Sequence, residues 1–207
     1  LREKIESVAS RMKSFGDGMQ SIGTKMSAGI SLPIIGIGVA ALKAAADQEQ
    51  LQIAFTTMLG SGEKAQKMLD DLARFSAETP FEMPQVQAAA KQLLAFGINA
   101  NDIEPTLRQL GDVAAGVGAP IGDLAYLFGT ASASGRLMTA DINQFATRGI
   151  PIIDSLATVL GVATTEVRDM AAEGLITSDH MKKAFAVMTA DGSKFGGMMA
   201  AQSASLL

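Results

Sequence analysis

Four polar side chains in one short stretch of the sequence have the types needed for binding or for a network of ion pairs. The stretch runs from Gly135 to Pro151 and reads GRLMTADINQFATRGIP. Its polar members include Arg136, Asp141, Gln144 and Arg148. Two guanidinium groups and a carboxylate around one corner can pair with one another, or they can present a docking patch to a partner. The sequence leaves both alternatives open, and we expect the corner itself to be structural.

Other residues with catalytic potential are few. His180 is the single histidine, and we expect it to be a solvated first-turn residue because its neighbour Ser178 is not positioned as a nucleophile. Glu78 and Glu82 could form the carboxylate pair of a glycoside hydrolase, although a polar collar around a loop anchored by Phe81 is the simpler interpretation. The chain contains no cysteine, which excludes disulfides, thiolate nucleophiles and cysteine-based metal sites. We therefore predict no catalytic residue, no cofactor and no bound metal.

Local signals place the corner's polar residues on two short helices joined by a tight turn. Gly135 ends the preceding helix, and Thr139 is a suitable N-cap for the next one, with Asp141 in the first turn where the helix dipole favours an anion. Gly149 suits the left-handed position that closes this helix, and Pro151 opens the following one. The apolar stripe of the first helix consists of Ile142, Phe145 and Ala146.

Composition indicates that the surrounding domain is built from helices. The chain is 48% hydrophobic but only 5% aromatic, so its core must be filled by aliphatic residues and by 12 methionines, which adapt to helix-on-helix packing. The alternation typical of strands is absent almost everywhere, which argues against a sheet. We predict an all-α protein, with an N-terminal coiled-coil-like helix and an apolar hinge followed by a compact bundle of short helices.

The pattern of apolar and helix-ending residues divides the chain into four parts. These are an amphipathic heptad helix over residues 1–27, an uncharged hinge or latent membrane segment over residues 26–46, a helical body over residues 47–190, and a Gly/Ser-rich flexible tail over residues 191–207. The predicted helix starts in the body include Ser61, Pro84, Asn101 or Asp102, Thr139, Thr164 and Thr177, and the predicted breaks include Gly116, Gly118 and Pro120. The helix that follows Ser61 is predicted to carry one apolar stripe, formed by Ala65, Met68, Leu69, Leu72 and Phe75. Because the chain begins at Leu1 rather than Met, we expect it to be part of a longer polypeptide.

The first segment has the spacing of a coiled coil. Apolar residues follow one another at alternating intervals of four and three, which places them at successive a and d positions. This period favours self-association, as a trimer or hexamer, and the alternative is an amphipathic helix that lies on its own domain. The predicted interface residues are Ile5, Val8, Met12, Phe15, Met19, Ile22 and Met26.

The uncharged segment that follows approaches the length of a membrane-spanning helix. Residues 26–42 carry no charge, but they contain Pro33 and several glycines, which weaken a free-standing helix. Three interpretations compete, in this order: a buried hinge, a latent membrane segment that inserts after a conformational change, and a constitutive transmembrane helix. The candidate membrane residues are Ile34, Ile35, Ile37, Val39 and Leu42.

Charge is unevenly distributed along the chain. Residues 1–46 contain six Lys and Arg against three Asp and Glu, a net charge of +3, whereas residues 47–207 contain 11 against 18, a net charge of −7. An acidic body argues against a generic nucleic-acid surface, because phosphate backbones are bound by basic side chains. We expect no sequence-specific nucleic-acid partner.

The order of residues between Gly135 and Pro151 resembles the signature block of tape measure proteins from long-tailed bacteriophages. The matching positions are Gly135, Arg136, Leu137, Asp141, Ile142, Gln144, Phe145, Gly149, Ile150 and Pro151. Further motifs resembling the family's pattern are Thr79-Pro80-Phe81, Phe96-Gly97, Leu110-Gly111-Asp112, Glu173-Gly174-Leu175-Ile176-Thr177, Ala184-Phe185, Met188-Thr189, Lys194-Phe195-Gly196-Gly197-Met198-Met199 and Gln202-Ser203. The resemblance covers residues 47–203.

This resemblance implies a structural protein of the phage tail and not an enzyme. Family members lie as several copies in the lumen of the growing tail, set its length, and help tube subunits assemble on the tail tip or baseplate hub with a tail assembly chaperone. They leave ahead of the DNA during ejection, which implies locations in the virion, in the host cytoplasm during assembly and at the host membrane or envelope on ejection. Two alternatives stand beside this interpretation: a membrane-active pore former acting through residues 26–46, and a cell-wall hydrolase using Glu78 or Glu82.

The heptad segment predicts that the solution mass changes when this segment is removed. Light-scattering chromatography should find residues 1–207 as a trimer or hexamer and residues 47–207 as a monomer, because the shorter chain lacks the a and d side chains that form the interface. A monomer for both chains would contradict self-association through this segment.

Overall fold

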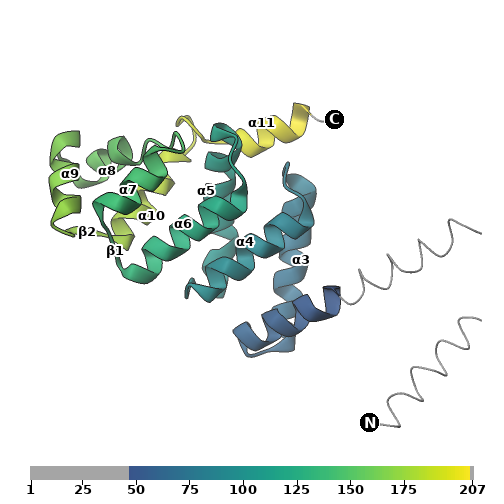
Figure 1. Cartoon of the computed structure of the whole chain (residues 1–207). Helices are drawn as coiled ribbons and strands as arrows, with labels where there is room; N and C mark the ends of the chain where they lie inside the picture. Colours follow the sequence, from purple (N-terminus) through teal and green to yellow (C-terminus); the bar gives the residue numbers. More distant parts are fainter. Residues whose placement is uncertain (1–46, 206–207) are drawn as a thin grey trace, which may run out of the picture. The chain divides into compact units, whose positions relative to one another are not determined.

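The structure, a computed structural model, describes residues 47–205 (Figure 1). Residues 47–59 are helical, and the elements that follow in chain order are α3 (Gly62–Glu78), α4 (Met83–Ala95), α5 (Ala100–Val117), α6 (Ile121–Ser134), β1 (Arg136–Leu137), α7 (Thr139–Ala146), α8 (Ile152–Leu160), α9 (Thr164–Ala172), β2 (Ile176–Thr177), α10 (Ser178–Met188) and α11 (Met198–Ser205). The predicted heptad helix and the uncharged segment lie outside the described residues, together with their candidate interface and membrane side chains. Of the described residues, 51–205 belong to one compact unit of the chain.

The all-α prediction is confirmed for the part of the chain that the structure describes. α3 shows how local signals produce a helix: the Ser61 side chain accepts a hydrogen bond from the Lys64 N–H (3.3 Å), which satisfies one of the free donors at the helix start. The residues that α3 buries are those on its predicted apolar stripe, namely Ala65, Met68, Leu69, Leu72 and Phe75. A stripe with this spacing lies on one face, so α3 packs its apolar side on the core and leaves its charged side in solvent.

Two helix pairs organise the core of the unit. α4 packs along α6, and α8 packs along α10, which brings the middle of the chain against its later part (Figure 1). An aromatic cluster joins α6 and α10 to α7: Phe128 of α6 and Phe145 of α7 both lie edge-to-face on Phe185 of α10, with ring centroids 5.2 and 5.6 Å away. All three rings are buried, so this cluster links the segments before and after the signature corner.

Glycines allow close approach where the packed elements meet. A Cβ atom placed on Gly129 in α6 would overlap the ring of Phe96, which follows α4, and one placed on Gly116 in α5 would overlap the ring of Phe195. The sequence predicts a chain break at Gly116, but the structure continues α5 through it to Val117. The physical reason is packing: the missing side chain at Gly116 makes room for Phe195.

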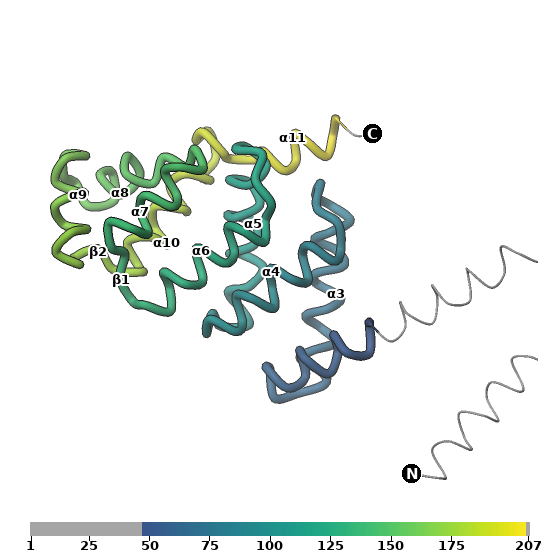
Figure 2. Tube along the Cα trace, viewed as in Figure 1, coloured from purple at the N-terminus to yellow at the C-terminus, as the bar shows by residue number. Residues whose placement is uncertain are grey.

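The segment after α10 also differs from the sequence-based expectation. The sequence predicts a flexible tail over residues 191–207, whereas the described part of this segment is packed against α5 (Figure 2). The Phe195 side chain is only 2% exposed, and its N–H donates to the Met188 carbonyl (3.1 Å). Phe195 and Met199 bury apolar surface and so stabilise the segment, although its Gly- and Ser-rich composition suggests a flexible tail.

Three predicted helix starts are shifted. α5, α7 and α9 are preceded by the N-caps Asn99, Met138 and Ala163, so the candidates Asn101 or Asp102, Thr139 and Thr164 already lie inside the helices. At α7, the Asp141 carboxylate accepts the Met138 N–H (2.9 Å), and this contact accompanies a helix start at Met138 rather than at Thr139. The described residues also contain a two-residue antiparallel ladder, β1–β2, which is too short to produce an alternating sequence pattern.

Two substitutions in α6 should have opposite effects on stability. Gly129→Ala must displace the Phe96 ring, so we expect the free energy of unfolding to fall by about 1 kcal/mol despite the better helix propensity of alanine. Gly122→Ala meets no atom within 4 Å and should raise the free energy of unfolding, by up to about 1 kcal/mol. Urea unfolding of both variants measures the two effects, and stabilisation by both would show that Phe96 does not pack closely on α6.

Candidate functional site

The signature corner is held in place by two buried side chains of a short helix. Ile142 and Phe145 are the buried residues of α7, and α7 is otherwise exposed or half-buried. Its end is closed by backbone hydrogen bonds, in which the Ile150 N–H donates to the Phe145 carbonyl (3.2 Å). Gly149 has φ +79°, which confirms the predicted left-handed position. Pro151 directly precedes α8 as its N-cap residue.

A ladder of two residue pairs connects the corner to a second family motif. Arg136 pairs with Thr177 and Leu137 with Ile176, and both apolar residues of the second pair are fully buried. One further backbone bond extends this connection, because the Ser178 N–H donates to the Gly135 carbonyl (3.0 Å). Two stretches that resemble the family separately, around residues 135 and 175, therefore form one local structure.

His180 has a structural role in this connection. It lies in the first turn of α10, as the sequence predicts, and its Nδ1 atom accepts the Thr177 N–H (3.2 Å). In return, Thr177 Oγ1 accepts the His180 N–H (3.3 Å), so the two residues cap the helix start reciprocally. The imidazole is thus occupied by a helix cap, and Ser178 beside it donates its backbone N–H to the ladder.

The polar residues of the corner do not form an ion-pair network. Asp141 accepts the Met138 N–H (2.9 Å), and Arg148 Nη1 donates to the main-chain carbonyl of Gln144 (2.8 Å). Between residues 47 and 205 neither Arg136 nor Arg148 forms an ion pair, and both side chains are exposed. The network alternative is therefore wrong for the described residues, and the docking patch stays a prediction.

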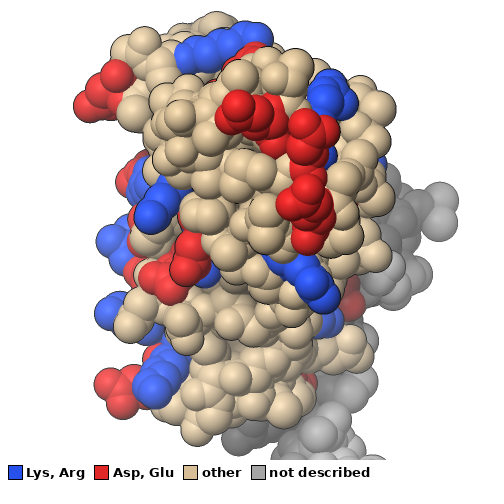
Figure 3. Space-filling model, turned by 90° about the vertical axis from the view of Figure 1, so that its left-hand side faces the viewer, with Lys and Arg blue, Asp and Glu red and all other residues tan. Residues whose placement is uncertain are grey.

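An open depression of about 370 Å³ lies beside the corner. Gly149 and Pro151 line it from the corner, and Asp154, Thr164 and Arg168 line it from α8 and α9. Figure 3 shows the face at the α9 end, where acidic and basic side chains are interspersed among larger uncharged areas. A mixed surface of this kind suits a protein partner better than a phosphate backbone, which requires a basic surface.

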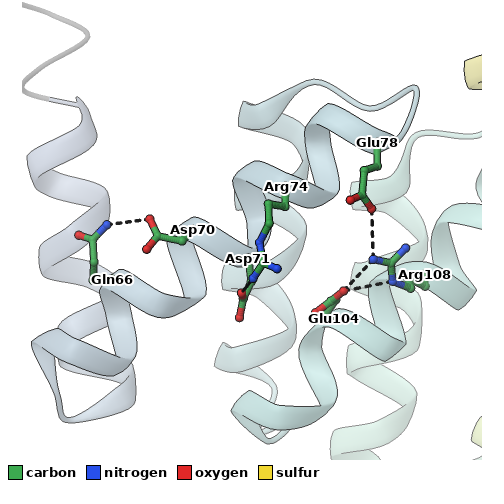
Figure 4. A network of polar contacts seen from close by, with 7 residues as sticks. All are labelled: Gln66, Asp70, Asp71, Arg74, Glu78, Glu104 and Arg108. Atoms are coloured by element: carbon green, nitrogen blue, oxygen red, sulfur yellow. Dashed lines mark hydrogen bonds and ion pairs between the residues drawn. The ribbon is translucent and has the colours of Figure 1, made fainter.

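Glu78 and Glu82 have separate structural roles. Glu78 ends α3 and lies 3.5 Å from the guanidinium of Arg108, which also binds Glu104 at 2.8 Å (Figure 4). Glu82 is the N-cap of α4, and its backbone N–H donates to the Gln85 side chain (3.1 Å). These contacts are those of helix ends, and they give the hydrolase alternative no support. Phe81 lies in the turn between Glu78 and Glu82, is half-buried and packs against the core. This is the anchoring position that the collar interpretation predicts for Phe81.

The Glu78–Arg108–Glu104 group contributes modestly to stability. The hydrogen bonds that Arg108 donates to Glu104 raise the pKa of Arg108 above its ordinary value, and Glu78 adds to this effect. A raised pKa means that the contribution is present below the unfolded-state pKa of arginine and is lost only at strongly alkaline pH, so it is constant in the neutral range. The three side chains are 43–59% exposed, and exposed pairs of this kind are worth less than about 1 kcal/mol each.

Residues 47–205 contain no group of three metal-ligating His, Cys, Asp or Glu side chains. Within the same residues, no helix has the length and apolarity needed to cross a membrane.

The contact between α5 and the last segment could not be recognised from the sequence. Asp112 accepts the Met199 N–H (2.9 Å), and the Gln202 side chain donates to the Ala115 carbonyl (2.8 Å). Both α5 residues lie in or beside the Leu110-Gly111-Asp112 motif, and the other partners belong to the closing motif. No local pattern pairs residues that lie this far apart in the chain.

Together, the fold and these contacts define a structural all-α module, in which polar side chains cap helices and connect their ends. The chain belongs to the tape measure protein family, because a family model described as "Tape measure protein" matches residues 40–206. This confirms the resemblance and identifies the chain as a structural component of a bacteriophage tail. No curated protein and no solved structure matches the chain.

Substitutions at the corner should separate its structural residues from its exposed ones. In Gly149→Ala, a residue with a Cβ atom must adopt the left-handed backbone conformation at position 149. We therefore expect the free energy of unfolding to fall by about 1–2 kcal/mol. Arg136→Ala and Arg148→Ala should each change it by less than about 0.5 kcal/mol, because neither side chain forms an ion pair within the described unit. Urea unfolding measures all three variants, and a large loss in an arginine variant would show that this arginine is structural.

Proposed function

We propose that residues 47–205 are the folded, tip-associated module of a tape measure protein that sets tail length, supports tube assembly on the tail tip and assists genome ejection. The observation that supports this proposal is the compact bundle of short helices in a chain of the tape measure family. A module of this kind presents a defined surface to partners, whereas a ruler requires extended length.

The arithmetic of helix length separates these two tasks. A single helix of residues 51–205 would reach about 230 Å at 1.5 Å per residue. The helices α3 to α11 are only 8–18 residues long and fold back on one another. On this proposal the described unit adds little to the measured length, and helical sequence outside it provides the ruler.

The proposed partners follow from the surfaces of the chain. Other copies of the chain, as a trimer or hexamer, associate through the heptad residues, and the exposed corner with Arg136 and Arg148 docks on a tail protein such as a tube, tip or baseplate hub subunit or an assembly chaperone. The net charge of −7 over residues 47–207 helps the protein leave beside DNA, because like charges repel. The proposed location is the tail lumen and tip, with the host cytoplasm during assembly and the host envelope during ejection.

An in-frame deletion of residues 51–205 in the phage tests this proposal. Because the proposal assigns tip assembly to this unit, we expect electron microscopy of lysates to show few or no complete tails and the infectious titre to collapse. A phage with Gly122→Ala serves as the control, since this change lies in an open position of α6 and should leave tail number and length unchanged. Complete tails shortened by about 230 Å would contradict the proposal, because they would show that the unit is part of the ruler.

A further inference from the structure

The last helix of the unit is held on α5 by two polar contacts and one buried side chain, and a third polar contact joins it to α3. The Met199 N–H donates to Asp112 Oδ1 (2.9 Å), and Gln202 Nε2 donates to the Ala115 carbonyl (2.8 Å). A weaker bond runs from Ser203 Oγ to the Glu78 carbonyl (3.3 Å), at the end of α3. α11 therefore packs on α5 and reaches the end of α3 (Figure 2).

Two methionines supply the apolar part of this docking. Met199, at 6% exposure, is the one buried residue of α11, and its side chain fills the space that a Cβ on Gly111 would occupy. Met198, at the start of the helix, is half-buried and packs against the core. The neighbouring residues Ala200, Ala201 and Gln202 are exposed. An isolated helix of eight residues is unstable in water, so the helical state of α11 depends on its docking.

The residues just before α11 are held more firmly. Phe195 is buried in the notch at Gly116, and its N–H donates to the Met188 carbonyl (3.1 Å). Gly197 separates this anchor from α11 and has φ +72°, a conformation open to glycine and strained for other residues. The segment thus consists of a fixed aromatic anchor, a glycine pivot and a weakly held helix.

The start of α11 receives its cap from another helix. Gly197 has no side chain to satisfy the free N–H groups of the first turn, and the Asp112 carboxylate of α5 accepts one of them instead. The negative charge also interacts favourably with the positive end of the helix dipole. Capping of α11 and docking of α11 are therefore the same event.

We infer that α11 is a releasable strap, which docks on α5 and leaves it as a unit by pivoting at Gly197 while Phe195 stays buried. Release removes the link from α11 to the end of α3 and uncovers the notch at Gly111, beside the ring of Phe81. The strap thereby controls whether this apolar face of α5 is covered. This inference goes beyond the proposed function and does not depend on it.

Native-state hydrogen exchange of the full 1–207 chain tests the strap, with amides resolved by NMR at increasing, non-denaturing concentrations of guanidinium. The amides of Met199 and residues 201–205 should share one protection factor, about 100-fold below that of the α6 core. This protection factor should change little with denaturant concentration, because a local opening exposes little surface. The Phe195 amide should exchange with the core. Three results would overturn the inference: exchange of α11 only with global unfolding, a gradual decline of protection from residue 201 to residue 205, or no protection at all.

Two variants examine the cause of the protection. Asp112→Ala removes the cap and should lower the protection of α11 about tenfold without changing α6, whereas Asp102→Ala, the matched change in the first turn of the same helix, should leave α11 unaffected. Met199→Ala improves the intrinsic helix propensity of α11 but removes its buried side chain. We expect its protection to fall, and a rise would show that α11 forms without docking and would overturn the inference.

Discussion

The edge-to-face contacts of Phe185 with Phe128 and Phe145 are the interaction on which the rest of the unit depends. α7 has eight residues and buries only two of them, so it is too short to be stable alone. The burial of Phe145 against α10 fixes the position of α7. The position of α7 then fixes the turn at Gly149 and the start of α8. In a chain with few aromatic residues, placing three rings at one point joins the segment before the corner to the segment after it.

This arrangement explains why the corner can be both structural and exposed. Apolar side chains and backbone hydrogen bonds fix the path of the chain, and Asp141 is used at the start of α7. The two arginines are not needed for these contacts and lie at the surface next to a shallow depression. Within residues 47–205, the corner is a rigid frame whose two arginines form no ion pair, and exposed cations of this kind can contribute to the choice of a partner.

Local signals were sufficient to predict much of the fold. The stripe of α3, its Ser61 cap, the Thr177 cap and the left-handed Gly149 are each encoded within a few residues, and the structure confirms them. Errors arose where a distant contact decided the outcome. Gly116 resembles a helix breaker until Phe195 is seen packing on it, and the closing segment resembles a flexible tail until Met199 and Asp112 are seen together. The ladder between β1 and β2 is too short to produce the alternating pattern of a strand, although its residues belong to two of the motifs that resemble the family.

The same ladder has a consequence for the way the unit responds to mechanical force. It joins the chain just after α6 to the chain just before α10, with Ser178 bonded to Gly135, so that α7, α8 and α9 form a side loop between two tied points. Tension applied to both ends of the unit passes across the ladder and reaches this loop only after the ladder has parted. Under such tension the unit would therefore lose the helices outside the two tied points first and keep the signature corner folded longest.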